Sequence, residues 1–533
     1  MARDARTDEE RSTQHRAAVL SMPYVDTSKI LNKVLYREVL TPEEIKQKRI
    51  VPLFVDNHTI NFGITNNTSQ KAMKLLHDHF LDQRVTFSIV SDSGFNDYVT
   101  LYDPPKKVKY QDISIKQGDS KADIAELSAI LAEVRPDDML GFLVQQAFKL
   151  GSSDIHLESK SEGARIRFRV DGVLHRIAEL TTERYRQLVS VLAVAADIST
   201  ADEEAQTGQI NRSFQLATGE EVVVNLRVEA VPAVNGMDAV LRLFNFKPEM
   251  LQLDRLGLNE KQDAMMRDII AKPSGLVMVV GPTGSGKSTT LYSLINELNN
   301  DQRKIITLED PVEYRIEGIT QIPVKTRDGD SFNKKLRSVL RLDPDIIMIG
   351  EIRDSDTAKT ALQAALTGHL VLSTYHASSA SAALTRLLDA IGENPLYAST
   401  IRLIQSQRLV RRLDDNTKKQ YEPSAGLEGH LEEIVQSIKA DVDLSFLPDA
   451  RLYEPVATKD SPFGYEGQFA IREMLTMTPD LVNLLTTKKA HELTTETIEA
   501  VAVDNGMLTM KQDGVLRALK GDTTYEEILR VLG

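Results

Sequence analysis

Residues 276–288 read LVMVVGPTGSGKS, and the glycines, lysine and serine of this segment have the spacing of a phosphate-binding loop. Residues 281–288 fit the pattern G-x-x-x-x-G-K-[ST] at every fixed position. Such glycines let backbone N–H groups turn toward anionic oxygens, while Lys287 can reach the β- and γ-phosphates and Ser288 can hold Mg²⁺. The predicted nucleotide-binding residues are Gly281, Pro282, Thr283, Gly284, Ser285, Gly286, Lys287, Ser288 and Thr289.

The elements around this loop have the order that the chemistry requires. A valine-rich run, typical of a buried strand, precedes the loop, and the helix-like segment TTLYSLINELNN follows it. The positive end of that helix would face the phosphates.

A second apolar run, DIIMIGE over residues 345–351, ends in an acid. A carboxylate opposite a phosphate loop can order Mg²⁺ through water or activate the attacking water. The alternative is a core strand that ends in a solvated acid. Beside the phosphate loop we favour a catalytic Glu351 that also holds Mg²⁺ through water.

Residues 307–314, TLEDPVEY, place three carboxylates at the end of another apolar run. Mg²⁺ and a water nucleophile both need such groups, which makes Glu309 and Glu313 candidates. The alternative is a polar loop that Asp-Pro opens. Spacing alone leaves both interpretations open.

Two histidines flank the strand-like run 370–375, since residues 367–377 read TGHLVLSTYHA. Polar groups at the end of such a strand can contact a γ-phosphate or report its loss. For His369 and His376 alike, the alternative is a histidine that is hydrogen-bonded in a loop or interface.

The composition predicts a protein of several domains without a membrane span. The chain has 533 residues, 41% hydrophobic and 26% charged residues, and a net charge of −13, which argues against general coating of nucleic acid. No apolar run approaches the ~18 residues of a membrane helix, and the charged start is not a secretory signal. Cysteine is absent, so neither disulfides nor thiolate metal sites can form. We expect a cytoplasmic protein.

Strand-like and helix-like runs alternate along most of the chain. From residue 275 onward the alternation predicts a mostly parallel sheet with helices on both faces. Two smaller mixed regions precede it, so the predicted fold class is multidomain α/β.

The four segments, in this order, resemble the secretion ATPase superfamily, most closely the type II secretion and type IV pilus assembly branch. In that family they are the Walker A, Asp box, Walker B and His box motifs. The resemblance runs from about residue 120 to the end of the sequence. It includes SSDIHLE at 152–158, RFRVDG at 167–172, QRLVRR at 407–412, and the later segments GYEG, NGMLT and GDTTYEE.

The resemblance implies a C-terminal RecA-like ATPase domain preceded by two smaller α/β N-domains. Composition and periodicity along the chain set the boundaries, and the resemblance gives the domains their roles. The predicted division is a mobile N-terminus (1–16), a partner-binding first N-domain (17–103), a linker (104–120), a second N-domain (121–247), a bridge (248–274), the ATPase core (275–413), a variable segment (414–462) and a helical C-terminal region (463–533).

The resemblance also implies that ATP binds between the second N-domain and the ATPase core. Arg227 and Arg242 are the candidate N-domain arginines, with Arg169 less certain, because a guanidinium neutralises charge on the transferring phosphoryl group. Glu351 would act on water, with Glu309 and Glu313 near the metal, and the histidines would couple the γ-phosphate to ring motion.

The implied activity is that of a hexameric motor. It would hydrolyse ATP with Mg²⁺ at the cytoplasmic face of the membrane and drive pilus or pseudopilus assembly. Its partners would be a polytopic inner-membrane platform protein and an assembly protein bound by the N-domains, without nucleic acid. A retraction ATPase, or a nucleotide-binding ring scaffold with little hydrolysis, is the alternative.

This sequence departs from the family in three places. The zinc-binding insert with two Cys-x-x-Cys pairs is absent, so we expect no zinc site and an irregular stretch over 414–462. Gln209 stands where the family has an arginine, and Met237 where it has an acid.

Overall fold

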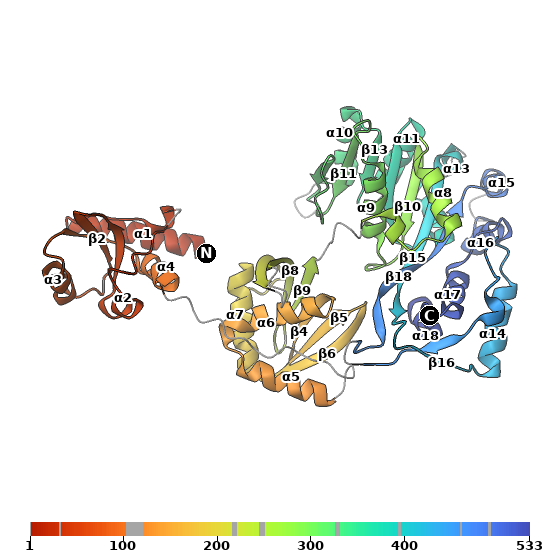
Figure 1. Ribbon diagram of the computed structural model, residues 1–533. Coiled ribbons are helices and arrows are strands. Elements are labelled where there is room, and N and C mark those ends of the chain that lie inside the picture. The colour runs from red at the N-terminus through yellow and green to blue at the C-terminus, as the bar shows by residue number, and fades with distance from the viewer. Residues whose placement is uncertain are drawn as a thin grey trace. The chain divides into compact units, whose positions relative to one another are not determined.

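The computed structural model describes residues 2–30, 33–102, 121–215, 221–244, 251–325, 331–392, 396–458, 461–488 and 492–533. The chain forms two compact units, Met1–Gln111 and Asp112–Gly533, shown in Figure 1. The predicted linker 104–120 lies outside the described residues. Among the described helices, none is long and apolar enough to cross a membrane.

The first unit is a three-stranded sheet with helices. Strand β2 lies in the middle, antiparallel to β1 and parallel to β3. Local signals set the helix starts: Thr41 and Glu44 form a capping box with a proline in the first turn of α2. The elements are α1 (Ala2–Val19), α2 (Pro42–Lys48), β1 (Ile50–Val55), β2 (Thr59–Ile64), α3 (Gln70–His79), β3 (Arg84–Ile89) and α4 (Asp92–Tyr102).

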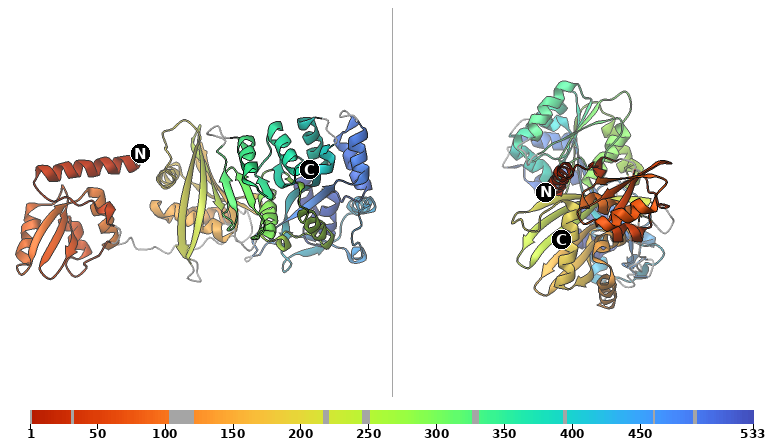
Figure 2. Two further views of the ribbon diagram at one scale, coloured as in Figure 1. Left: turned by 90° about the horizontal axis from the view of Figure 1, so that it is seen from above. Right: turned by 90° about the vertical axis from the view of Figure 1, so that its left-hand side faces the viewer.

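The start of the chain differs from the expectation of a mobile segment over residues 1–16. It forms the long helix α1, which is visible in Figure 2. Glu10 accepts hydrogen bonds from the hydroxyls of Tyr24 (2.6 Å) and Ser91 (2.7 Å), and Glu9 accepts one from the Ser93 backbone N–H (3.1 Å). These side-chain contacts attach a strongly polar helix that has no apolar stripe of its own, which is why its sequence gave no helical periodicity.

The second unit begins with an antiparallel sheet in the order β6-β5-β4-β9-β8-β7. A left-handed turn at Asp171 and Gly172 joins β5 to β6, as the Asp-Gly pair predicts. The elements are α5 (Lys121–Glu133), α6 (Pro136–Lys149), β4 (Ser152–Lys160), β5 (Gly163–Val170), β6 (Val173–Leu180), α7 (Thr182–Ala196), β7 (Gln206–Gln215), β8 (Glu221–Ala233) and β9 (Gly236–Phe244).

A seven-stranded sheet in the order β12-β11-β13-β14-β10-β15-β18 follows. All of its neighbouring strands run parallel except the last pair. Its core elements are α8 (Glu260–Ile270), β10 (Gly275–Val280), α9 (Lys287–Leu298), β11 (Ile305–Glu309), β12 (Thr320–Pro323), α10 (Phe332–Val339), β13 (Ile346–Ile349), α11 (Ser355–Leu366), β14 (Leu370–Tyr375), α12 (Ala380–Ile391), α13 (Leu396–Thr400) and β15 (Ile401–Leu413).

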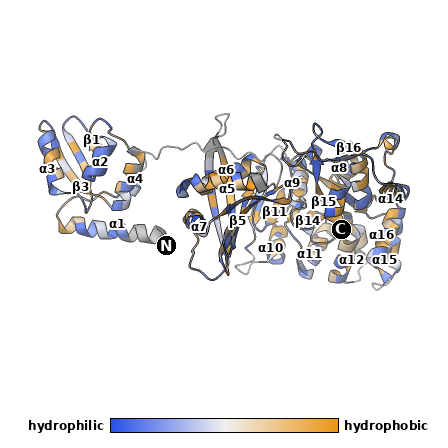
Figure 3. Cartoon of the chain, turned by 90° about the horizontal axis from the view of Figure 1, so that it is seen from below, coloured by the Kyte–Doolittle hydropathy of each residue, from blue (hydrophilic) through white to orange (hydrophobic). Residues whose placement is uncertain are grey.

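Both faces of this sheet are buried by helices, as predicted. Strand β10 is fully buried, and its side chains alternate between two apolar clusters. Leu276, Met278 and Val280 join the cluster that contains residues of α10, α11 and α12. Val277 and Val279 join the cluster with α8 and α9. The helices carry hydrophobic and hydrophilic residues side by side in Figure 3, as expected for helices with one buried face.

The sequence-based boundaries after residue 413 need correction. Residues 414–462 are not irregular throughout, because they contain β16 (Lys419–Tyr421), α14 (Ala425–Gln436) and β17 (Leu452–Glu454). The predicted helical region 463–533 begins with a twelve-residue strand, β18 (Tyr465–Thr476), which pairs antiparallel with β15. The remaining elements are helices: α15 (Pro479–Thr487), α16 (Thr495–Asp504), α17 (Met510–Leu519) and α18 (Tyr525–Leu532).

Candidate active site

The phosphate loop lies between β10 and α9, where the sequence predicts it. Gly286 has left-handed φ and precedes α9 without a side-chain cap, so the first N–H groups of this helix remain open to an anion. A Cβ added to Gly281 would lie 2.5 Å from Ser285 Oγ and 2.7 Å from the carbonyl oxygen of Gln407. The loop therefore has a shape that requires glycine at this position.

Lys287 folds back onto its own loop. Its Nζ donates to the carbonyl oxygens of Gly281 (3.0 Å) and Pro282 (2.8 Å). Burial lowers the pKa of Lys287, and the charge of Glu351 opposes that shift. The ammonium group is thus held by neutral oxygens that a phosphate group can replace.

Gln407, on the neighbouring strand β15, forms hydrogen bonds to the phosphate loop and to α9. Its Nε2 donates to the carbonyl of Ser285 (2.6 Å), while its Oε1 accepts from Thr290 Oγ1 (3.0 Å) and from Gln405 Nε2 (2.8 Å). The sequence assigned no site role to Gln407, because its contacts depend on β15 lying beside β10.

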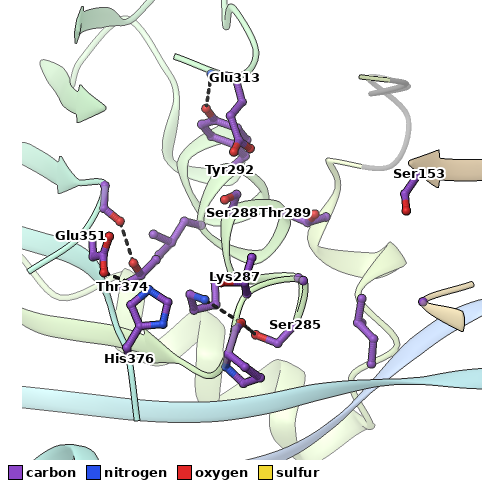
Figure 4. A pocket seen from close by; sticks show the side chains of 18 of the residues that line it. Ser153, Ser285, Lys287, Ser288, Thr289, Tyr292, Glu313, Glu351, Thr374 and His376 are labelled. Carbon is purple, nitrogen blue, oxygen red and sulfur yellow. Dashed lines mark hydrogen bonds and ion pairs between the residues drawn. The ribbon is translucent and has the colours of Figure 1, made fainter. Parts of the chain in front are cut away.

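Glu351 lies two residues after β13 and faces His376, which follows β14. Glu351 Oε1 is 2.9 Å from His376 Nε2, and Glu351 Oε2 is 2.8 Å from Arg353 Nε. Thr374 donates to the carbonyl of Gly350 at 2.7 Å and holds the turn before the acid. Figure 4 shows Glu351, Thr374 and His376 together on one side of the pocket.

His369 does not join this group. It precedes β14 and His376 follows it, so roughly 20 Å of extended backbone separates them. The ring nitrogen Nδ1 of His369 lies 2.9 Å from the carbonyl oxygen of Ala364. The predicted contact of His369 with a γ-phosphate is therefore not supported, and the simpler interpretation of a histidine satisfied in a loop fits the geometry.

Glu309 and Glu313 lie in different environments. Glu309 is buried, and its Oε1 accepts from Thr307 Oγ1 (2.5 Å) and Gln321 Nε2 (3.0 Å) while its Oε2 accepts from the hydroxyl of Tyr292. Both oxygens accept hydrogen bonds within the fold, and Glu309 also lines the pocket beside the phosphate loop.

Glu313 faces the nucleotide loop. Burial and the nearby Glu309 raise the pKa of Glu313, whereas Arg242 and a hydrogen bond from Ser288 lower it. Of the two acids predicted near the metal, only Glu313 therefore contacts a phosphate-loop side chain.

The second N-domain supplies a further wall of the pocket. Ser153, Asp154, Arg169 and Arg242 line it together with the phosphate loop. Asp154 is buried and receives two guanidinium groups: its Oδ1 lies 2.9 Å from Arg242 Nε and its Oδ2 lies 3.4 Å from Arg169 Nε. In Figure 4, Ser153 lies across the pocket from Glu351 and His376.

Strand register explains why these arginines come together. Arg169, Asp154, Arg242, Arg227 and Gln209 occupy directly paired positions on five adjacent strands. Arg169, the less certain candidate, lines the pocket. Arg227 pairs with Glu229 at 2.8 Å, lies outside the pocket lining, and acts on Glu313 only through its charge.

A third wall comes from segments late in the chain. Leu409, Gln468, Arg530 and Val531 line the same cavity, whose volume is about 950 Å³. The N-domain contacts this region directly, because the N–H of Gly467 donates to Asp171 (3.2 Å) and His175 stacks on Phe463 with ring centroids 3.7 Å apart.

The residues present fit a nucleotide with Mg²⁺. The open helix N-terminus and Lys287 suit phosphate oxygens, and the hydroxyl of Ser288 together with carboxylates provides the oxygen donors that Mg²⁺ takes. A nucleotide-sized cavity with an acid beside a phosphate loop and with arginines from a second domain defines a phosphate-loop ATPase.

Comparison with known proteins gives the family. The family model of the type II/IV secretion system proteins matches residues 137–530, and the chain belongs to this family. A type II secretion system protein E from Xanthomonas campestris pv. campestris is 40% identical over 424 residues, covering 79% of this chain and 71% of that protein. The type IV pilus assembly ATPase PilB of Pseudomonas aeruginosa is 30% identical over 526 residues, covering 97% of this chain and 89% of PilB.

Solved structures share the fold. The X-ray structure of the ATPase DotB from Legionella pneumophila has a TM-score of 0.54 at 23% identity and covers 74% of this chain and 95% of DotB. DotB from Yersinia pseudotuberculosis has a TM-score of 0.56 at 20% identity, with 80% and 99% coverage.

Proposed function

We propose that this protein is a hexameric motor ATPase that drives assembly of a type IV pilus or of a type II secretion pseudopilus. The observation that carries the proposal is the three-walled pocket, in which the second N-domain faces the phosphate loop. ATP turnover can thus be coupled to movement of one domain against another. The similarity to PilB along 97% of this chain, including the first N-domain, supports an assembly motor over a retraction motor.

Each pocket wall has its own part in the proposed reaction. The phosphate-loop N–H groups and Lys287 bind the β- and γ-phosphates. Glu351 orients a water whose oxygen attacks the γ-phosphorus as the bond to the β-phosphate oxygen breaks, and His376 and Arg353 keep the carboxylate in place. Ser288, and Glu351 through water, would hold Mg²⁺, which would supply positive charge to neutralise the phosphates.

The N-domain arginines complete the charge balance of the transition state. Asp154 forms ion pairs with Arg242 and Arg169 at the pocket surface, and these pairs orient both guanidinium groups. We assign phosphoryl contact to these two residues and a longer-range electrostatic role to Arg227.

The proposed partners follow from the same function. The motor would work at the cytoplasmic face of the membrane on a polytopic platform protein, with the first N-domain binding an assembly protein. Zinc has no part in this proposal, because the sequence contains no cysteine.

Phosphate release by the purified protein tests the enzymatic part. Lys287→Ala should reduce turnover at least a hundredfold while the unfolding temperature stays within a few degrees of the parent. Turnover by the variant at the parent rate would contradict the role of the loop. Zero turnover by the parent, with and without membranes that contain the platform protein, would favour the scaffold.

Complementation tests the biological part. A strain that lacks the gene should lose surface pili or secretion and recover it with the parent gene but not with Lys287→Ala. A deletion strain with excess pili would instead favour a retraction motor.

A further inference from the structure

Six lysine and arginine side chains of the described residues line the pocket, and they differ in whether they form an ion pair with a carboxylate. Four of the six form ion pairs, namely Arg169 and Arg242 with Asp154, Arg353 with Glu351, and Arg530 with Glu527. Within the described part of the chain, Lys287 and Arg408 alone among these six form no ion pair. Lys287 is the lysine of the phosphate loop, which leaves Arg408 to be explained.

Arg408 lies beside the start of the phosphate loop. It belongs to β15, which pairs with β10 on the side opposite β14. Its Nη1 donates to the carbonyl of Gln407 (3.0 Å), and its Nη2 donates to the carbonyl of Ser378 (2.9 Å). Ser378 follows His376 in the loop after β14, so the guanidinium group extends from one neighbour of β10 toward the other.

Those two bonds fix the orientation of Arg408 without neutralising it. A guanidinium carries five N–H donors, and both hydrogen bonds of Arg408 go to neutral carbonyl oxygens. Burial lowers the pKa of Arg408, and the charge of Glu473 opposes that shift. The oxygens of Glu473 accept from the N–H groups of Ala380 (2.6 Å) and Met510 (3.2 Å), so this acid is itself tied to two helix ends.

Arg408 and Lys287 line the same cavity. The charge of Arg408 helps to lower the pKa of Lys287, although burial is the larger cause. Two cations that line the same partly buried cavity repel each other, and a bound anion removes this cost.

We propose that Arg408 binds the terminal phosphate of the nucleoside triphosphate together with Lys287. The position of Arg408 in the pocket favours the terminal phosphate over the others. Arg408 is hydrogen-bonded to the loop that carries His376, and His376 pairs with Glu351, the acid assigned to the attacking water. This inference rests on the proposed ATPase function for the placement of the terminal phosphate.

Nucleotide binding by the full-length protein with Mg²⁺ tests it, using a non-hydrolysable ATP analogue and ADP as separate probes. Arg408→Gln should lower the affinity for the analogue about tenfold or more, because a hydrogen bond to a charged group is worth roughly a factor of ten. Its affinity for ADP should fall less than about threefold. Arg408→Lys should fall between, because it keeps the charge and loses the planar donors.

Arg412→Gln is the matched control. Arg412 lies on the same strand, but its guanidinium packs over the Phe469 ring, 5.1 Å from its centroid, and it does not line the pocket. We expect it to bind both nucleotides like the parent.

Two results would overturn the inference. One is parent-like affinity of Arg408→Gln for the ATP analogue; the other is an equal loss for the analogue and ADP. Thermal unfolding of each variant identifies misfolding, and binding is then compared below the transition with Arg408→Lys. If the parent binds the analogue but never releases phosphate, the proposed function fails while the Arg408 result still stands.

Discussion

At the scale of residues, the segment TLEDPVEY shows how environment separates two chemically identical groups. Glu309 is enclosed by Tyr292, Thr307 and Gln321, which satisfy both of its oxygens. Glu313, four positions later, faces Ser288 and the N-domain arginines. Glu309 is therefore held by hydrogen bonds within the fold and Glu313 faces the phosphate loop, and both line the pocket.

Glu309→Gln should mainly lower stability, whereas Glu313→Gln should mainly lower turnover. An amide at 309 brings an N–H₂ group against the hydroxyls of Tyr292 and Thr307, so we expect a loss of about 1–3 kcal/mol in unfolding free energy. At 313 we expect near-parent stability and a turnover reduced about tenfold or more. Denaturant unfolding and phosphate release measure the two effects, and parent-like turnover of Glu313→Gln would contradict the assignment.

The sequence predicts the residues of this site that belong to a local pattern. The phosphate loop, Glu351 and His376 lie where their spacing places them. Asp154, Gln407 and Arg408 escape prediction, because their roles arise from strand neighbours such as β4 beside β9 and β15 beside β10. The structure does not support the predicted role of His369, because His369 and His376 lie at opposite ends of β14 and only the end with His376 lines the pocket.

At the scale of elements, the cysteine-free region 414–462 is held by apolar packing. Leu431 and Ile434 of α14 join a cluster with Leu452 of β17 and with Tyr525 and Ile528 of α18. Cations stack on aromatic rings around it, for example Lys418 over Tyr453 at 4.8 Å. These contacts position the region.

Leu431→Ala should therefore lower the unfolding free energy by about 2–5 kcal/mol, the usual cost of a cavity at a buried leucine. Glu432→Ala, exposed on the same helix, should change it by less than about 0.5 kcal/mol. Chemical denaturation measures both, and equal effects would contradict the packing role of α14.

Helix α18 is attached to β15 through Glu527. Burial alone would raise the pKa of Glu527, but hydrogen bonds from Arg530 and Arg411 lower it to about 2. A depressed carboxyl pKa stabilises the folded state fully above the unfolded value near 4.5 and progressively less as pH falls toward 2.

Glu527→Gln should thus cost about 3 kcal/mol at pH 7, and the difference from the parent should shrink between about pH 4.5 and pH 2. Unfolding free energies measured across this pH range test the sign. A difference that stays constant with pH would rule out the ionised pair as its source.

Element types follow from local pattern more reliably than element boundaries. The strand, loop and helix around Lys287 have a clear sequence pattern, a valine-rich run followed by the phosphate-loop motif. Strand β18 was assigned to a helical region, although it pairs with β15 over most of its length. A strand at the edge of a sheet that is otherwise parallel lacks the continuous apolar run of the inner strands.

At the scale of the molecule, the two units differ in what they contain. Among the residues that the structure describes, all those that line the nucleotide pocket lie in Asp112–Gly533. The first unit has its own apolar core around Phe62 and Tyr98. The described nucleotide pocket is thus built from the second unit, and partner binding by the first unit stays a proposal.

A protein that begins at Asp112 should bind ADP within about threefold of the full-length affinity. Equilibrium binding tests this, with circular dichroism as the control for folding. A loss greater than about tenfold in the folded fragment would mean that the first unit contributes to the pocket.

Gln468, Arg530 and Val531 form part of the pocket wall, yet the ribosome makes them long after the phosphate loop. While the chain emerges, Lys287 and Glu351 are already present but their cavity has no third side. The nascent chain should therefore pass through synthesis without consuming ATP, and a message truncated before β18 should yield an inert product instead of an uncoupled ATPase.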